Sequence, residues 1–348
     1  MEKNSNEKKI KVAITHGDIN GVGYEVLIKT FSDIRMFDIC TPVLYGLSKV
    51  ASYHKNLLSS VQQEMQFYSI HDASEVQDRR YNVVNLVQEE VKIDLGKSTE
   101  IAGKLSRMSL DRACEDLKAG KVDVLVTAPI NKRNIQALDF DFPGHTEYLS
   151  HQFGSSSLML MVCDRIRIGI VTNHLALKDV PAALTHNLLF DKMMLLNESL
   201  KRDFGITRPK IAVLALDPHA GDNGVIGDFD AKVIKPVIDE VQQKGVLAYG
   251  PFPSDGFFGS SEFNKFDGVL ALYHDQGLIP FKLMSFTEGV NYTAGLPYVR
   301  TSPAHGTGYD IAGKDIANEQ SFRSAVYLAC KIFKNRQEYD ALNANPLK

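Results

Sequence analysis

Three histidines in the second half of the chain, His174, His219 and His274, each follow a short apolar run typical of a buried strand. If these strands lie parallel in one sheet, their carboxyl ends meet at one edge and bring the imidazoles together. Three neutral imidazoles with an open position form a known site for a catalytic divalent metal. A single such histidine is more often a hydrogen-bonded structural residue, but three with the same local pattern favour a metal site.

The residue types available decide which metal the sequence predicts. The chain has four scattered cysteines and no closely spaced pair, so neither a disulfide framework nor a cysteine-based zinc site is indicated. Imidazole nitrogen favours Zn²⁺ or Co²⁺ over Mg²⁺, which prefers oxygen ligands. An ion with open positions would act as a Lewis acid on a substrate hydroxyl or carbonyl.

Three further polar residues, Lys282, Asn291 and Arg300, follow His274 closely in the sequence. They supply cationic and neutral donors suited to a phosphate or a carboxylate. Any one Lys or Arg is usually a solvated surface charge, but their place just after a candidate metal ligand favours ligand contact. We therefore expect them to bind an anionic substrate.

Alternating strand and helix patterns must position these residues. Lys11 to Phe31 predicts a strand, a glycine-containing turn and a helix, and the spacing of apolar residues between Gly103 and Gly120 predicts an amphipathic helix before the strand VDVLVT. This order predicts an α/β fold with a mixed, largely parallel sheet. The glycines at 17, 21 and 23 do not form the GxGxxG fingerprint, so a Rossmann fold is not indicated.

Composition limits the class of protein. A chain of 348 residues exceeds what one hydrophobic core usually organises, so two domains are expected. A net charge of -3 gives no electrostatic reason to expect a nucleic-acid partner. The first ten residues are polar, and no later apolar run approaches the roughly 20 residues that span a bilayer. These features predict a cytoplasmic protein with no membrane partner.

Several ordered motifs carry a resemblance to a known family: VTAPINK, FPGHTEYL, the strand end at His174 followed by Asp179 and Val180, DPHAG, LYHDQGLIPFK, and GLPYVRTS with HGT. Through them the chain resembles, from Ile14 to about Ala325, the 4-hydroxythreonine-4-phosphate dehydrogenases of vitamin B6 biosynthesis. The resemblance implies an NAD-dependent, metal-dependent oxidation of 4-phosphooxy-L-threonine at C3. Decarboxylation would then give 3-amino-2-oxopropyl phosphate for pyridoxal 5′-phosphate synthesis.

The resemblance also implies roles for individual residues and an assembly. The metal ligands would be His174, His219 and His274, and the substrate-binding residues would be His145, Thr146, Lys282, Asn291 and Arg300. The expected assembly is a homodimer whose active sites are shared between subunits.

The implied architecture is the two-domain α/β/α layering of isocitrate and isopropylmalate dehydrogenases. A first domain on the cofactor side would comprise residues 1–135 and 270–348. A second domain on the metal and dimer side would comprise residues 136–269. The active site would lie in the cleft between the two.

A second similarity concerns the cofactor. The segment HGTGYDIAGKDIAN, His305 to Asn318, is similar to the adenosine-binding loop of isopropylmalate dehydrogenases. By that comparison His305, Gly306 and Asp310 would contact the cofactor. Asp310 would accept hydrogen bonds from the ribose hydroxyls and repel a 2′-phosphate, which favours NAD over NADP.

Some positions depart from the family pattern and leave alternatives open. They are His16, Ile19, Asn20, Asp217, Gly256 and Ala304. None removes a predicted metal ligand, but a sister group with the same metal site oxidises D-threonate or D-erythronate 4-phosphate. The proton acceptor also stays open among Lys282, Asp255, Asp275 and a metal-bound water. A metabolite sensor and a metal-dependent hydrolase are the competing functions.

Overall fold

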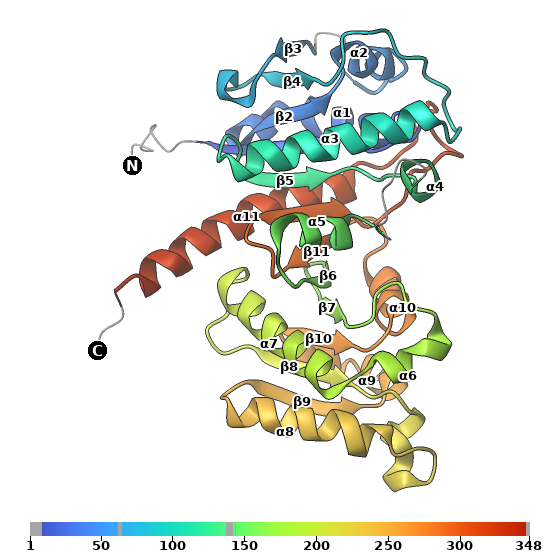
Figure 1. The fold of residues 1–348 in the computed structure, drawn as a ribbon, viewed down its shortest axis with the longest axis vertical. Helices are drawn as coiled ribbons and strands as arrows, with labels where there is room; N and C mark the ends of the chain where they lie inside the picture. The colour runs from blue at the N-terminus through green and yellow to red at the C-terminus, as the bar shows by residue number, and fades with distance from the viewer. Residues whose placement is uncertain (1–8, 62–64, 137–141, 143, 346–348) are drawn as a thin grey trace. The chain divides into compact units, whose positions relative to one another are not determined.

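The chain divides into two units in the structure, a computed structural model that describes residues 9–61, 65–136, 142 and 144–345 (Figure 1). Unit 1 comprises Met1–Gly144 and Tyr298–Phe333, and unit 2 comprises His145–Pro297 and Lys334–Lys348. These bounds differ from the predicted domains, because residues 136–144 group with unit 1, and residues 270–297 and 334–348 group with unit 2. A boundary at residue 270 would cut through β10 (Gly268–Ala271), which pairs with two other strands of unit 2.

The sheet of unit 1 is entirely parallel, in the order β3-β4-β2-β1-β5-β12. Central strands of such a sheet are covered on both faces, which explains continuous apolar runs such as VLVT. The strands are β1 (Ile10–Thr15), β2 (Cys40–Gly46), β3 (Phe67–Ile70), β4 (Tyr81–Asn85), β5 (Val124–Thr127) and β12 (Val299–Pro303).

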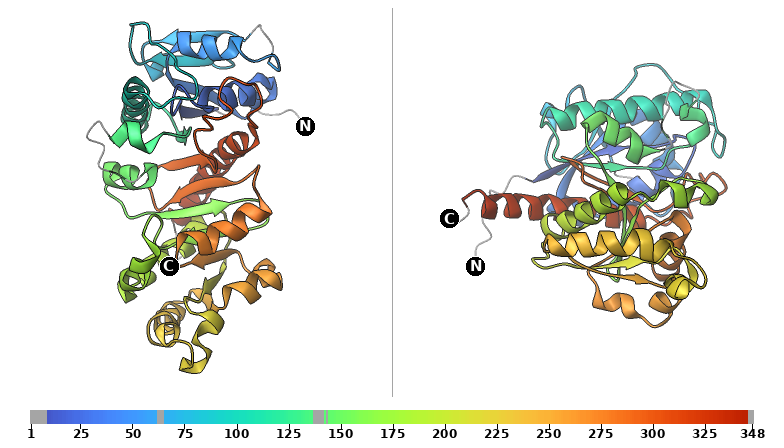
Figure 2. Two further views of the ribbon diagram at one scale, coloured as in Figure 1. Left: turned by 90° about the vertical axis from the view of Figure 1, so that its right-hand side faces the viewer. Right: turned by 60° about the horizontal axis from the view of Figure 1, so that its bottom comes forward.

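Helices cover both faces of the unit 1 sheet. Along the strand order of the sheet, the chain moves in one direction from β1 to β2 and in the opposite direction from β4 to β5. Because such crossovers are right-handed, the connecting helices α1 and α3 lie on opposite faces of the sheet, as Figure 2 shows. The predicted amphipathic helix is confirmed as α3. The helices are α1 (Gly23–Ser32), α2 (Ser48–Asn56), α3 (Glu100–Lys118), α4 (Lys132–Gln136) and α11 (Gln320–Asn343), with 3₁₀ turns η1 (Ile34–Asp38) and η2 (Ala73–Glu75).

The sheet of unit 2 is mixed, in the order β11-β6-β7-β10-β8-β9. β6 runs antiparallel to both β11 and β7, whereas β7, β10, β8 and β9 are parallel to one another. The predicted α/β class with a mixed, largely parallel sheet is therefore confirmed. The strands are β6 (Leu158–Val162), β7 (Arg167–Ile170), β8 (Lys210–Leu214), β9 (Leu247–Phe252), β10 and β11 (Val290–Ala294).

Two helices sandwich the centre of the unit 2 sheet. Gly268 of β10 faces α7, where an added Cβ would lie 2.9 Å from Leu200. A Cβ added at Gly277 of α10 would lie 3.1 Å from the Cβ of Ala271. Residues 268 and 271 point to opposite faces of a strand, so α7 and α10 cover opposite faces. The helices are α5 (His145–Phe153), α6 (Val180–Ala183), α7 (His186–Arg202), α8 (Lys235–Gln243), α9 (Ser254–Gly259) and α10 (His274–Met284).

Short non-α turns complete unit 2: η3 (Leu177–Asp179), η4 (Pro218–Gly224), η5 (Asp230–Ile234) and η6 (Glu262–Lys265). Among the helices of the described residues, none has the length and apolar character needed to cross a membrane.

Candidate active site

The three predicted metal ligands follow neighbouring strands. β10 pairs in parallel with β7 on one side and with β8 on the other. The carboxyl ends of β7, β10 and β8 therefore lie at one edge of the sheet, and His174, His274 and His219 come just after them. This pairing agrees with the expectation that the three strands end at the same edge of the sheet.

Two of the histidines form a pair. The rings of His174 and His274 lie with their centroids 6.1 Å apart. Nδ1 of His174 is 3.4 Å from Oε1 of Glu147, and Nδ1 of His274 is 2.6 Å from Oδ1 of Asp275. A carboxylate on Nδ1 leaves Nε2 as the ring nitrogen for a metal, an arrangement common in metal sites. These two residues fit an imidazole-ligated metal.

The third histidine is not part of that pair. His219 is exposed and lies in η4, a turn in which consecutive residues from His219 to Gly224 have positive φ. Within the described part of the chain, no group of three or more His, Cys, Asp or Glu side chains could hold a metal ion. One copy of the chain thus presents two paired imidazoles at the strand edge and a third imidazole on an exposed turn.

The left-handed turn at His219 is strained. Ala220 and Asp222 have φ of 52° and 44°, in the region that costs a non-glycine residue about 1–2 kcal/mol. Gly221 cannot be replaced, because a Cβ there would lie 2.3 Å from the carbonyl oxygen of Gly227. Strain of this kind is often kept at functional sites, and here it presents a predicted ligand.

Replacing Ala220 with glycine should relieve part of this strain. We expect Ala220→Gly to raise the free energy of unfolding by up to about 1 kcal/mol, because glycine adopts positive φ without steric cost. Ala182→Gly, at an exposed position in α6, is the matched control and should lower it by about 0.5–1 kcal/mol. Urea titration measures both, and equal destabilisation by the two changes would contradict the strain.

The candidate proton acceptors lie at different places in unit 2. Asp275 contacts His274, as described above, while Asp255 is exposed in α9, directly after β9. Lys282 is exposed on α10, eight residues beyond His274, which corresponds to about 12 Å along the helix axis. Of the three, Asp275 is the one in contact with a predicted metal ligand.

The predicted substrate-binding residues are divided between the units. His145 and Thr146 begin α5 of unit 2, and Thr146 is buried. Asn291 lies in β11 of the same unit, and its buried Oδ1 accepts no hydrogen bond from the described residues, which fits an absent ligand. Arg300 belongs to unit 1, where its buried guanidinium donates a 2.6 Å hydrogen bond to Thr127 Oγ1.

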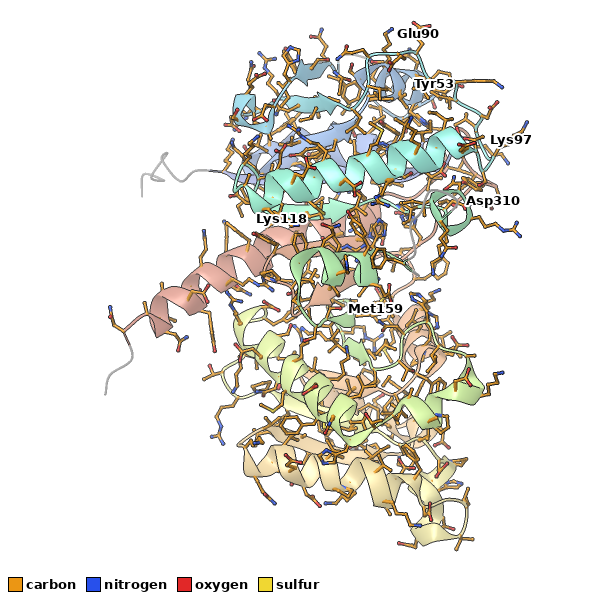
Figure 3. All side chains as sticks on the ribbon, in the orientation of Figure 1. Tyr53, Glu90, Lys97, Lys118, Met159 and Asp310 are labelled. Carbon is orange, nitrogen blue, oxygen red and sulfur yellow. The ribbon has the colours of Figure 1, made fainter. Side chains whose placement is uncertain are left out.

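The predicted cofactor residues lie together on one loop of unit 1. His305 Nδ1 is 2.9 Å from the carbonyl oxygen of Gly306. Burial lowers the pKa of His305 below its ordinary value, so the ring is neutral at pH 7. Asp310 is exposed further along the loop (Figure 3), where its carboxylate can meet a ligand.

An anchor of this loop was not predicted from the sequence. Asp315 has φ of 59° and accepts hydrogen bonds from the backbone N–H and hydroxyl groups of Ser59 and Ser60, at 2.7–3.1 Å. Lys29 Nζ lies 3.0 Å from the same carboxylate. These contacts fix the cofactor loop to the end of α2, and because they join residues far apart in the chain, no local sequence pattern indicated them.

The Asp315 anchor should make stability depend on acid. The hydrogen bonds from Ser59 and Ser60, and then Lys29, hold the pKa of this carboxyl well below its usual range. The stabilisation that this carboxylate gives to the folded state is therefore complete above about pH 4, the pKa of an aspartate in the unfolded chain. It is lost as the pH falls below that value. We expect Asp315→Asn to lower the thermal midpoint at about pH 6, with a gap to wild type that shrinks towards about pH 2.

Asparagine tolerates positive φ, so this substitution removes the charge without backbone strain. Asp310→Asn on the same loop, which does not touch Ser59 or Ser60, is the control. A gap between Asp315→Asn and wild type that stays constant with pH would contradict the anchor.

Two departures from the family pattern serve packing. His16 is fully buried and stacks on Tyr24, with centroids 5.3 Å and planes 16° apart. Burial lowers its pKa to about 4, so it is neutral at pH 7. The buried Asn20 donates to the carbonyl oxygen of Lys97 at 2.9 Å and to Thr99 Oγ1 at 3.0 Å. Both residues are buried within unit 1.

Comparison with known proteins decides the family. Residues 38–329 match the family described as pyridoxal phosphate biosynthetic protein PdxA. The chain belongs to this family. A protein of Bacteroides thetaiotaomicron named 4-hydroxythreonine-4-phosphate dehydrogenase is 49% identical over 344 residues, which cover 98% of this chain and 94% of that protein. Membership in the PdxA family makes the chain an oxidoreductase and connects it with pyridoxine biosynthesis.

Solved PdxA-family structures share the fold over nearly the whole chain. The crystal structure of a 4-hydroxythreonine-4-phosphate dehydrogenase from Klebsiella pneumoniae matches with a TM-score of 0.80 and 30% identity, covering 94% of this chain and 100% of that one. The corresponding enzyme from Burkholderia phymatum matches with a TM-score of 0.76 and 33% identity, covering 94% and 99%. The predicted family is confirmed.

Proposed function

We propose that this PdxA-family chain oxidises 4-phosphooxy-L-threonine at C3 with NAD and a divalent metal. Decarboxylation then yields 3-amino-2-oxopropyl phosphate for pyridoxal 5′-phosphate synthesis. The observation that carries the substrate is the 49% identity, over almost the whole length, to a relative named for that activity. The paired imidazoles at the strand edge support a metal, and the exposed carboxylate on the 305–318 loop supports NAD.

His174 and His274 are proposed to hold the metal through Nε2, with Zn²⁺ favoured and Co²⁺ or Mg²⁺ as alternatives. The ion would supply Lewis acidity that lowers the pKa of the C3 hydroxyl and stabilises the negative charge left by CO₂. Asp275 accepts a hydrogen bond from the Nδ1–H of His274 and so leaves Nε2 free for the metal, while Lys282, Asp255 and Asp275 remain the candidates for moving the substrate proton.

The site is proposed to be completed by a second copy of the chain. The imidazoles of His174 and His274 are paired within one copy, whereas His219 lies on an exposed turn. Among the described residues of one copy, no group of three His, Cys, Asp or Glu side chains could hold a metal ion. A homodimer with two-fold symmetry would place each His219 at its partner's pair. This arrangement explains why three histidines at one strand edge do not form a closed triad in a single copy.

The remaining polar residues are proposed to bind the substrate. The unsatisfied Oδ1 of Asn291 can accept a hydrogen bond from its ammonium or hydroxyl group. Lys282 and Arg300 supply positive charge for phosphate and carboxylate, and His145 and Thr146 add hydrogen-bonding groups. Asp310 is proposed to bind the ribose hydroxyls of NAD and to disfavour the 2′-phosphate of NADP.

An absorbance assay for NADH tests the function. Metal-loaded protein should form NADH from 4-phosphooxy-L-threonine with NAD, and far less product with NADP. Turnover of D-threonate or D-erythronate 4-phosphate, with none of 4-phosphooxy-L-threonine, would assign the sister group's reaction. Phosphate release without NADH would identify a hydrolase, and metal binding without turnover of any of these substrates would identify a sensor.

A cytoplasmic location is proposed as well. The described cysteines are free thiols, which is typical of a reducing compartment. Fractionation of cells that produce the protein tests this, and recovery in a membrane or secreted fraction would contradict it.

A further inference from the structure

The segment FPGHTEYL contains one acidic residue, to which the proposed function gives no role. Glu147 is the third residue of α5, after His145 and Thr146. Its Oε1 lies 3.4 Å from Nδ1 of His174, and 27% of its side chain is exposed. The two residues come from different elements, since His174 follows β7. The contact is therefore made by the fold rather than by neighbouring positions in the sequence.

A lysine lies within electrostatic reach of this carboxylate. Lys192 of α7 donates a hydrogen bond to the carbonyl oxygen of Ser157. Burial lowers the pKa of Lys192, and the charges of Asp191 and Glu147 oppose that shift. Glu147 thus contacts His174 and also interacts with the charge of Lys192.

The position of a carboxylate decides which nitrogen of a neutral imidazole carries the proton. A carboxylate accepts hydrogen bonds only, so contact with Glu147 requires a proton on Nδ1 of His174. Nε2 then carries the lone pair that a metal needs. His274 has a comparable contact with Asp275, but there the two residues are adjacent in the chain.

We propose that Glu147 is a positioning residue that holds His174 in the Nδ1-protonated form and turns Nε2 towards the metal. This inference rests on the proposed metal site and deepens it. It assigns α5 two tasks, since the helix that begins with the predicted substrate residues also orients a ligand of the metal.

The first measurement needs no metal and no substrate. In metal-free protein labelled with ¹⁵N-histidine, the ring shifts of His174 report which nitrogen is protonated. We expect the Nδ1-protonated form in the wild type and a shift towards the Nε2-protonated form in Glu147→Ala. Glu147→Gln keeps an acceptor oxygen and should restore much of the wild-type pattern.

The second measurement is the affinity for Zn²⁺ and Co²⁺ in competition with a chromophoric chelator. We expect Glu147→Ala to weaken binding about 10–100-fold, and Glu147→Gln to weaken it less. The matched control is Glu240→Ala, because Glu240 lies 3.0 Å from His186 in another carboxylate–histidine pair of unit 2. This control should leave the metal affinity unchanged.

The outcomes separate this inference from the proposed function. An Nε2-protonated His174 in the wild type, or an unchanged metal affinity in Glu147→Ala, overturns the positioning role. His174→Ala tests the metal site itself, and full metal affinity in that variant overturns the site. If Glu147→Ala does not fold, Glu147→Gln and Glu147→Asp carry the test, and wild-type affinity in both overturns the inference.

Discussion

Mixing subunits of His219→Ala with subunits of His274→Ala should restore roughly a quarter of wild-type activity, although each variant alone has almost none. The reason is that His174 and His274 are paired within one copy, whereas His219 is proposed to reach the site of its partner. In the mixed dimer the His219→Ala subunit keeps its own pair and receives an intact His219. Half of the dimers are mixed, and each has one complete site.

The matched control is a mixture of His174→Ala with His274→Ala. These two residues serve the same site in one copy, so every site in the mixed dimer has lost one ligand. No activity should return. Metal content should follow activity in both mixtures, and circular dichroism should show that the single variants keep the fold, since all three positions are at least partly exposed.

Two results would contradict the shared site. Mass spectrometry can show whether His219→Ala and His274→Ala subunits form mixed dimers. If they do and no activity returns, the three ligands belong to one copy. If His219→Ala alone retains bound metal and activity, His219 is no ligand. Either result leaves the PdxA family membership intact and removes only the proposed assembly of the metal site.

The sequence predicted the elements around the site better than the geometry of the site. Apolar runs that end in His174, His219 and His274 predicted parallel strands, because a strand buried on both faces has a continuous apolar pattern. The same kind of run in β6, LMLMV, belongs to an antiparallel strand. Periodicity measures burial and carries no information on strand direction.

The details that the sequence did not predict depend on contacts between distant residues. The left-handed turn at His219 depends on several consecutive positive φ angles, of which glycine positions 221 and 224 give only a partial signal. The contacts of Asp315 with Ser59 and of Glu147 with His174 join residues far apart in the chain. Propensity and periodicity are local properties, so they could not predict these contacts.

A buried ion pair in unit 2 should contribute strongly to stability. Arg336 Nε donates to Oδ1 of Asp203 at 2.7 Å, and both side chains are less than a tenth exposed. Its other nitrogens donate to Tyr292 Oη at 2.9 Å and to the carbonyl oxygens of Leu296 and Pro297. The C-terminal part of α11 is thereby fixed to the loop after β11.

We expect Arg336→Met to lower the free energy of unfolding by about 3–5 kcal/mol, because it leaves the Asp203 carboxylate buried without its cation. Ser199 and Tyr292 still donate to that carboxylate, each at 2.6 Å, but neither neutralises it. The matched control is Arg202→Met, which breaks the surface pair with Asp340 and should cost less than about 1 kcal/mol.

The double variant Arg336→Met with Asp203→Asn separates lost packing from the unpaired charge. Because the asparagine carries no charge, the double variant should be more stable than Arg336→Met alone. Denaturant titration of wild type, Arg336→Met, Asp203→Asn and the double variant gives the coupling energy. Equal losses in Arg336→Met and Arg202→Met would show that the buried pair contributes no more than a surface pair. A double variant less stable than Arg336→Met would show instead that the ion pair matters mainly through the hydrogen bonds that the Asp203 carboxylate accepts from Ser199 and Tyr292.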